Sequence, residues 1–328
     1  MRRLSLINLI TVCLAFLVVG PFAGSALAQD DETVGPDTIL QNRILHDMAA
    51  AKAASALPGN AAPASSAQEQ GKSSAVSPAA TNTCAYTFTS GSGQTYLQFC
   101  VTVNGNITEF QSPVGVEQIR QGAYSEGYQI CDGTTGIAYY DYADAGATAN
   151  WNAPVTLSSS STSVKIQRTT SDGAWTLTQT FTKVGGTNPY AKITMALKNN
   201  SAETKFVELA RYADSDPDHA DSAHGNDGFL QDLDGTLDSA WGYIGIGNTS
   251  GNNAYGLMLQ IVGNPSPTSV PYGREGFAQN VSSGPPACSI FSHYASPITN
   301  TDGSIVYFYD FDLVHGQTVT VNERYMSF

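Results

Sequence analysis

The segment Trp175-Thr-Leu-Thr-Gln-Thr-Phe181 decides the fold class of this chain. Trp175, Leu177 and Phe181 fall on one face of an extended strand, and the intervening threonines fall on the other face. Gly185-Gly186 then predicts a turn, and residues 191–198 alternate between apolar and polar in the same way. Two such runs around a glycine turn predict an antiparallel hairpin.

Other runs with the character of strands surround this hairpin. They cover residues 96–103, 107–111, 164–166, 206–212, 255–262, 304–314 and 319–325. His315-Gly316-Gln317 predicts the turn between the last two runs. After residue 84, no long run of apolar residues recurs at helical spacing. The sequence therefore predicts an all-β fold, with residues 84–328 forming one large antiparallel β-sandwich.

The first 83 residues have a different character. Arg2 and Arg3 precede an apolar run that ends in Ala26-Leu27-Ala28, which predicts a signal peptide at 1–28. Apolar side chains at helical spacing predict a short amphipathic helix within 29–57. Residues 58–83 are rich in Ala, Ser and Pro, so we expect a disordered linker. These features predict a secreted or periplasmic protein.

The charge of the chain limits its expected partners. The formal net charge is −13 at pH 7, and loss of Arg2 and Arg3 with the signal peptide would make it −15. An acidic chain repels phosphate backbones and anionic lipid headgroups, so nucleic acid is not an expected partner. No stretch beyond the signal peptide is long and apolar enough to span a bilayer, so we expect no membrane insertion of the mature chain.

The cysteine count fits an exported protein. Cys84, Cys100, Cys131 and Cys288 remain after removal of the signal peptide, and an even number indicates two disulfides. Three pairings are open. We favour Cys84–Cys100, which would join neighbouring strands, together with Cys131–Cys288, which would close a long loop.

The most unusual segment is acidic and extends from 211 to 238. It holds eight aspartates and several glycines, and it follows a predicted strand. Asp214, Asp216 and Asp218 alternate, as the hard oxygen ligands of calcium often do, and they predict a calcium site. The segment lacks the glycine and the terminal glutamate of an EF-hand, so such a site would be irregular.

Other interpretations of this acidic segment remain open. A pair of carboxylates could provide a general acid and a general base, and His219 or His224 could transfer a proton or join a transition-metal site. The segment could also be a solvated acidic loop in which Asp214 caps a turn and pairs with Arg211. Whether the protein is an enzyme is not decided by these residues.

Aromatic residues provide a second indication of function. The chain has 16 tyrosines and 3 tryptophans. Tyr139, Tyr140 and Tyr142 cluster around Asp141, and Trp241 follows the acidic segment. Aromatic rings stack on sugar faces while carboxylates and amides bind the hydroxyl groups. Tyrosine and tryptophan also fill the cores of sheets, so each ring has an ordinary structural explanation as well.

Residues 175–218 carry a family resemblance. A strand that begins with Trp175, a strand that ends in Leu197-Lys-Asn-Asn-Ser201 and a strand that ends in Arg211-Tyr212-Ala-Asp214 together resemble galactose-mutarotase-like supersandwich domains. The resemblance implies a supersandwich-like fold and a sugar ligand. The catalytic histidine and glutamate of that family are not matched to positions of this chain, so it implies no epimerase activity.

Two hypotheses follow from the sequence. The first is an extracytoplasmic protein that binds or processes carbohydrate, with Tyr212, Trp241, Tyr140 and Arg211 as ligand-binding residues and a bound calcium ion. It predicts that Asp214, Asp216, Tyr212 and Trp241 converge in one concave site. The second is a non-enzymatic structural or adhesion module with a calcium-stabilised acidic loop. The oligomeric state is left open.

Overall fold

The described part of the protein is almost wholly β-structure. The computed structural model describes residues 83–119, 126–143, 147–215, 217, 227–231, 239–244, 255–263, 274–279, 288, 298–299 and 304–327. The predicted signal peptide, amphipathic helix and linker lie outside these residues, apart from Thr83. Helical structure in the described part consists of one short 3-10 turn, η1 (Gly93–Thr95), and no helix there is long and apolar enough to cross a membrane.

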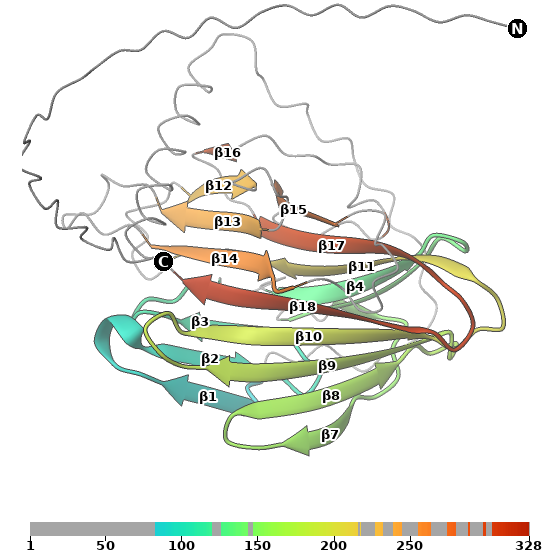
Figure 1. The fold of residues 1–328 in the computed structure, drawn as a ribbon, viewed down its shortest axis with the longest axis horizontal. Helices are drawn as coiled ribbons and strands as arrows, with labels where there is room; N and C mark the ends of the chain where they lie inside the picture. Colours follow the sequence, from blue (N-terminus) through green and yellow to red (C-terminus); the bar gives the residue numbers. More distant parts are fainter. Residues whose placement is uncertain are drawn as a thin grey trace, which may run out of the picture.

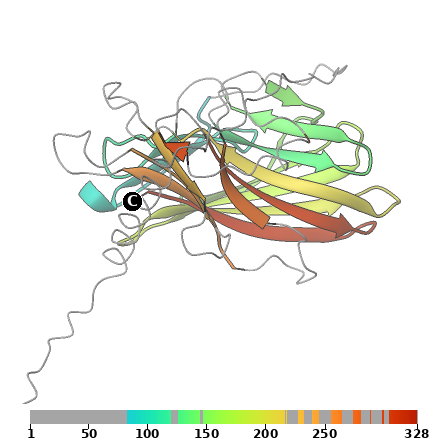
Figure 2. The ribbon, with the colours of Figure 1, turned by 90° about the horizontal axis from the view of Figure 1, so that it is seen from above.

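The strands form three antiparallel sheets (Figure 1). The largest has nine strands in the order β16 (Ile298–Thr299), β12 (Asp227–Gln231), β13 (Ser239–Ile244), β14 (Gly256–Ile261), β18 (Thr318–Ser327), β10 (Tyr190–Asn199), β9 (Trp175–Val184), β8 (Ser163–Thr169) and β7 (Val155–Ser159). The second has six strands in the order β15 (Arg274–Gln279), β17 (Ser304–Leu313), β11 (Lys205–Ala213), β4 (Glu126–Asp132), β5 (Ile137–Tyr142) and β6 (Ala147–Ala149). The third contains β1 (Tyr86–Ser90), β2 (Leu97–Val101) and β3 (Ile107–Gln111). Seen from above, the long strands are strongly twisted (Figure 2).

The hairpin predicted from residues 175–198 is confirmed as β9 and β10. Its two strands pair antiparallel from Trp175 opposite Asn199 to Val184 opposite Tyr190. The apolar positions of β9 are buried, whereas its threonines are half-exposed. Gln179 lies in the apolar phase and is also buried, so one polar side chain enters the interior from this strand.

One apolar core joins all three sheets. It includes Phe99 from the three-stranded sheet, Leu209 from the six-stranded sheet and Leu177 from the nine-stranded sheet. The rings of Phe110 on β3 and Tyr325 on β18 meet edge-on at 6.2 Å between centroids. The three-stranded and six-stranded sheets therefore both pack against the inner face of the nine-stranded sheet. The predicted antiparallel β-sandwich is confirmed.

Both favoured disulfides are present. Cys84 and Cys100 are bonded 16 residues apart, and Cys131 and Cys288 are bonded 157 residues apart. The first bond ties the chain just before β1 to β2. The second ties residue 288 to β4, in the middle of the six-stranded sheet. Disulfides are typical of proteins that fold outside the reducing cytoplasm, which agrees with an exported chain.

Candidate functional site

Three tyrosines lie in a row on the outer face of the six-stranded sheet. Tyr140 and Tyr142 on β5 stack with ring centroids 5.2 Å apart, and Tyr142 lies 6.0 Å from Tyr212 on β11. Gly127 on β4 separates Tyr142 from Tyr212 in the register. A Cβ atom on Gly127 would come within 2.5 Å of the Tyr142 ring, so the glycine leaves the room that this ring needs.

A pair of carboxyl groups lies on the same face. Glu208 on β11 is directly opposite Asp310 on β17, and each side chain is partly exposed. Burial, and then the charge of Asp310, raises the pKa of Glu208 to about 8. Glu208 therefore carries a proton for much of the time at neutral pH and can donate a hydrogen bond. The carboxyl oxygens of Asp310 can accept a hydrogen bond, so the pair can both donate and accept.

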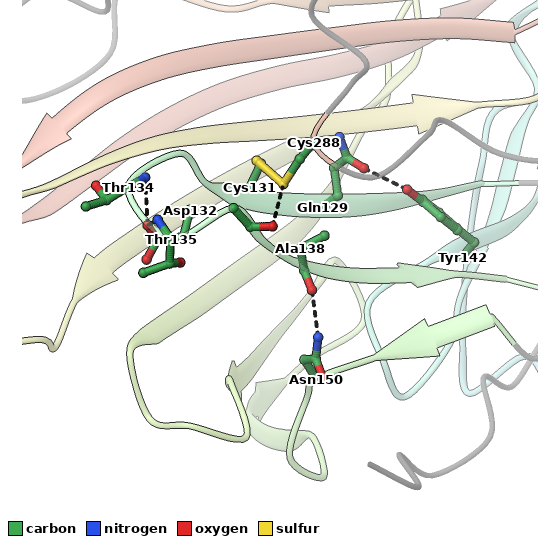
Figure 3. Close-up of a disulfide and its surroundings, with 10 residues drawn as sticks. Gln129, Cys131, Asp132, Thr134, Thr135, Ala138, Tyr142, Asn150 and Cys288 are labelled. Atoms are coloured by element: carbon green, nitrogen blue, oxygen red, sulfur yellow. Dashed lines mark hydrogen bonds between the residues drawn. A yellow bond between two sulfur atoms is a disulfide. The ribbon is translucent and has the colours of Figure 1, made fainter. Parts of the chain in front are cut away.

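Gln129 on β4 lies between these two groups of side chains. In the register it is opposite Tyr140 on one side and Ala210 on the other. Its side chain is buried, and its Oε1 accepts a 2.8 Å hydrogen bond from the Tyr142 hydroxyl (Figure 3). Its Nε2 is also buried but has no hydrogen-bond partner among the described residues. An unpaired buried amide costs about 1–3 kcal/mol, so this nitrogen needs an acceptor from outside the described part of the chain.

The disulfide at Cys131 adjoins this group of side chains. Cys131 is opposite Glu208 on β11 and opposite Ala138 on β5, on the same outer face. Its bond to Cys288 ties residue 288 to the strand position opposite Glu208. Figure 3 shows this bond beside Gln129. We call the set Gln129, Tyr140, Tyr142, Glu208 and Asp310 the outer-face site.

The structure brings two of the four predicted ligand-binding residues to this face. Tyr140 belongs to the outer-face site, and Tyr212 adjoins it through Tyr142. Arg211 points the other way, into the core, where its guanidinium pairs with Glu126 at 2.5 Å. Because it is fully buried, it is not available to a ligand at the surface.

Trp241 lies on the other sheet. It belongs to β13 in the nine-stranded sheet, where its Nε1 donates a 2.8 Å hydrogen bond to the Ser239 hydroxyl. The neighbouring Ala240 contributes to the core, so Trp241 is on the outer face of its sheet. Tyr212 is likewise on the outer face of the opposite sheet. These two predicted residues therefore do not converge in one concave site, because alternation along each strand directs them away from the shared interior.

The predicted calcium ligands are only partly described. Asp214 is buried at the end of β11, beside the bridge from Ser215 to Ile119. Asp216, Asp218, His219 and His224 lie outside the described residues. No group of three or more metal-binding side chains occurs within the described ranges. The calcium site stays a prediction.

Sequence reasoning did not identify Gln129, Glu208 or Asp310. Each lies in an apolar strand at a position whose neighbours on the same face are mostly aromatic or small, such as Tyr140 and Ala210. Isolated polar residues in apolar strands were the available signal. Their grouping depends on the register of β4, β11 and β17, which the sequence does not reveal.

Comparisons with known proteins give no family assignment. No family model and no curated protein matches the chain. Solved structures with a similar arrangement include a galactose mutarotase-like protein from Lactobacillus casei ATCC 334, with 8% identity, a TM-score of 0.40, and coverage of 74% of this chain and 100% of that one. Two others are a candidate aldose 1-epimerase from Escherichia coli K12 (12% identity, TM-score 0.38, coverage 74% and 99%) and a galactose mutarotase related enzyme from Lactobacillus acidophilus (8%, 0.36, 74% and 97%). At identities and TM-scores this low, the likenesses define neither the family nor the function of the chain.

Fold and site together define a disulfide-bonded antiparallel β-sandwich with a tyrosine and carboxyl site on one outer face. The site combines aromatic rings with two partly exposed carboxyl groups.

Proposed function

We propose that this chain is an extracytoplasmic carbohydrate-binding or carbohydrate-processing protein, and that sugar binds at the outer-face site. The observation that carries the proposal is the grouping of partly exposed side chains on one outer face, where the ring of Tyr140 and the carboxyl groups of Glu208 and Asp310 lie on the same side of the six-stranded sheet. The carboxyl groups would exchange hydrogen bonds with sugar hydroxyl groups. The partly exposed ring of Tyr140 would stack on an apolar sugar face.

The carboxyl pair supports a neutral ligand. The negative charge of Asp310 adds to the rise in the pKa of Glu208, and the whole chain is acidic. A phosphorylated or carboxylated sugar would be repelled, whereas neutral hydroxyl groups can both accept from Glu208 and donate to Asp310. The same pair could also supply an acid and a base, so processing as well as binding is included in the proposal.

The first experiment is a glycan array probed with the mature protein. We expect binding to neutral glycans and a weaker signal for their acidic counterparts. Repeating the array with a chelator tests whether the predicted calcium ion contributes. If no glycan class binds above background, with or without calcium, the proposal is wrong and a structural or adhesion role becomes the better explanation.

The second experiment locates the site. Tyr140→Ala should weaken binding of the best glycan by about tenfold, as the loss of one stacking ring predicts. Tyr190→Ala is the matched control, because Tyr190 is a partly buried tyrosine on the other sheet, where it packs against Arg324. Equal affinities of the two variants in calorimetric titration would remove sugar binding from the outer-face site.

A further inference from the structure

The interior of the sandwich holds more buried acids than buried bases. Among the described residues, six carboxyl side chains and three basic side chains are buried. Arg168 pairs with Asp141, Lys205 with Asp132 and Arg211 with Glu126. The other three buried carboxyl groups, which these pairs do not include, belong to Glu117, Asp214 and Glu323.

Glu323 differs from the other two. Glu117 accepts hydrogen bonds from the backbone N–H groups of Phe110 and Ile119, at 2.6 and 3.3 Å. Asp214 lies at the end of its strand. Glu323 is in the middle of β18 and is fully buried, and neither of its carboxyl oxygens has a hydrogen-bond partner of ordinary geometry in the part of the chain that the structure describes. A carboxylate in that position would carry a large desolvation cost.

The surroundings of Glu323 offer little compensation for a negative charge. On its own sheet it is flanked by Ile193 of β10 and Ile261 of β14. Arg211 of β11 attracts it from the facing sheet, but this guanidinium already binds Glu126, which repels Glu323. The Tyr309 hydroxyl of β17 also favours the charged form. Burial outweighs both and raises the pKa of Glu323 to about 8.

We infer that Glu323 is kept as a neutral carboxylic acid between the two sheets, and that its ionisation at alkaline pH weakens the contact of β18 with β11. The folded protein is then favoured by mildly acidic surroundings. The inference does not depend on the proposed function, because Glu323 is buried on β18 of the nine-stranded sheet and the outer-face site lies on the six-stranded sheet.

The direction of the pH effect follows from proton linkage. Between pH 4.5, the ordinary carboxyl pKa, and about 8, the folded protein holds a proton on Glu323 that the unfolded chain has lost. Stability contributed by this group is therefore complete below about pH 4.5, falls as the pH rises, and is lost above about 8. Glu126, whose pKa burial raises to about 7, acts in the same direction.

The test is urea unfolding of wild type, Glu323→Gln and Glu109→Gln between pH 5 and 9. Glutamine has the shape of a protonated glutamate but cannot ionise. We expect the unfolding equilibrium constant of wild type to rise with pH more steeply than that of Glu323→Gln, by up to about tenfold per pH unit within the window. Glu109→Gln, a change at a partly exposed carboxyl on β3, should follow wild type.

Two outcomes would overturn the inference. One is a Glu323→Gln variant with the same pH slope as wild type. The other is infrared difference spectra at pH 6 in which wild type and Glu323→Gln show the same carbonyl band of protonated acid. If the glutamine variant does not fold, Glu323→Met also removes the titrating group and provides both readouts.

Discussion

Arg211 and Tyr212 are adjacent in the sequence and lie on opposite faces of the six-stranded sheet. The guanidinium of Arg211 pairs with Glu126 inside the sandwich, and the hydroxyl of Tyr212 receives a 2.9 Å hydrogen bond from Ser304 on the outer face of the sheet, where both side chains are buried. Strand β11 thus supplies the core with one set of side chains, and with the other set it supplies a second buried apolar cluster and Glu208 of the outer-face site. Adjacent residues of this strand should therefore differ in which side of the sheet a substitution disturbs.

Removing the charge of Arg211 should destabilise the protein strongly. Arg211→Met leaves the carboxyl of Glu126 buried without its cation, and breaking one side of a buried pair costs about 3–5 kcal/mol. Urea unfolding at pH 7.5 measures this cost. Lys165→Met is the control, because Lys165 is exposed on β8 and its loss should change stability by less than about 0.5 kcal/mol. A loss below about 1 kcal/mol for Arg211→Met would contradict the assigned pairing.

Substitution of Gln129 should separate stability from binding. Gln129→Met removes an unpaired buried amide as well as the acceptor of the Tyr142 hydroxyl, so the two effects oppose each other. We expect the free protein to change in stability by no more than about 1 kcal/mol. Affinity for the array-selected glycan should fall by about tenfold, because the Tyr142 ring that stacks on Tyr140 loses the acceptor that holds its hydroxyl. Unchanged affinity would mean that Gln129 takes no part in recognition.

The carboxyl pair should make binding depend on pH. Glu208, with a pKa of about 8, loses its donor hydrogen as the pH rises through that value, so glycan affinity should fall between pH 7 and 9. Burial is the larger cause of this raised pKa, and Asp310→Asn removes the charge that adds to it, so the pKa of Glu208 should move down in part and the fall in affinity should begin at lower pH. Titration of the Glu208 carboxyl by carbon NMR in both proteins measures the shift. Identical titration curves would refute the coupling of the pair.

The two disulfides should differ in their contributions to stability. By the loop-entropy model, a loop of about 15 residues gives about 3 kcal/mol and one of 100 residues gives about 4.7 kcal/mol. The bond between Cys131 and Cys288 closes the longer loop, so the Cys131→Ser, Cys288→Ser double variant should lose more stability than the Cys84→Ser, Cys100→Ser variant. Denaturant unfolding of both variants decides the order, and the reverse order would show that loop length does not control it.

Calcium binding by the acidic segment remains a prediction that a thermal shift can decide. If Asp214, Asp216 and Asp218 bind calcium, millimolar calcium should raise the melting temperature, since a ligand that binds only the folded state stabilises it. Asp216→Asn should remove the rise. Magnesium at the same concentration is the control for ionic strength. No rise with calcium would exclude the ion from both functional hypotheses.

The strands could be predicted from sequence where their two faces differ. Residues 175–198 show this clearly, because the threonines of β9 alternate with large apolar residues. Strand β4 was not predicted, because Glu126 and Asp132 give it the composition of a loop. Both are buried because two basic residues of the neighbouring strand β11 pair with them. Arg211 pairs with Glu126, and Lys205 pairs with Asp132. Local pattern cannot reveal a partner that is distant in the sequence.

The candidate site was predictable only in part, for a similar reason. The tyrosines around Asp141 were visible as a cluster, and Tyr140 does lie at the outer-face site. The opposition of Glu208 and Asp310 depends on the register between β11 and β17. Arg211, which the sequence predicts as a ligand-binding residue, lies in the core because side chains alternate between the two faces along a strand.

The covalent link between β4 and residue 288 also affects how damage to the protein would be detected. A protease that cuts once between positions 131 and 288 would leave two pieces still joined through sulfur. The nicked molecule would migrate as one species on a denaturing gel until a reductant is added. Its two halves would also stay at high effective concentration, so they could reassemble after a transient opening without a bimolecular search.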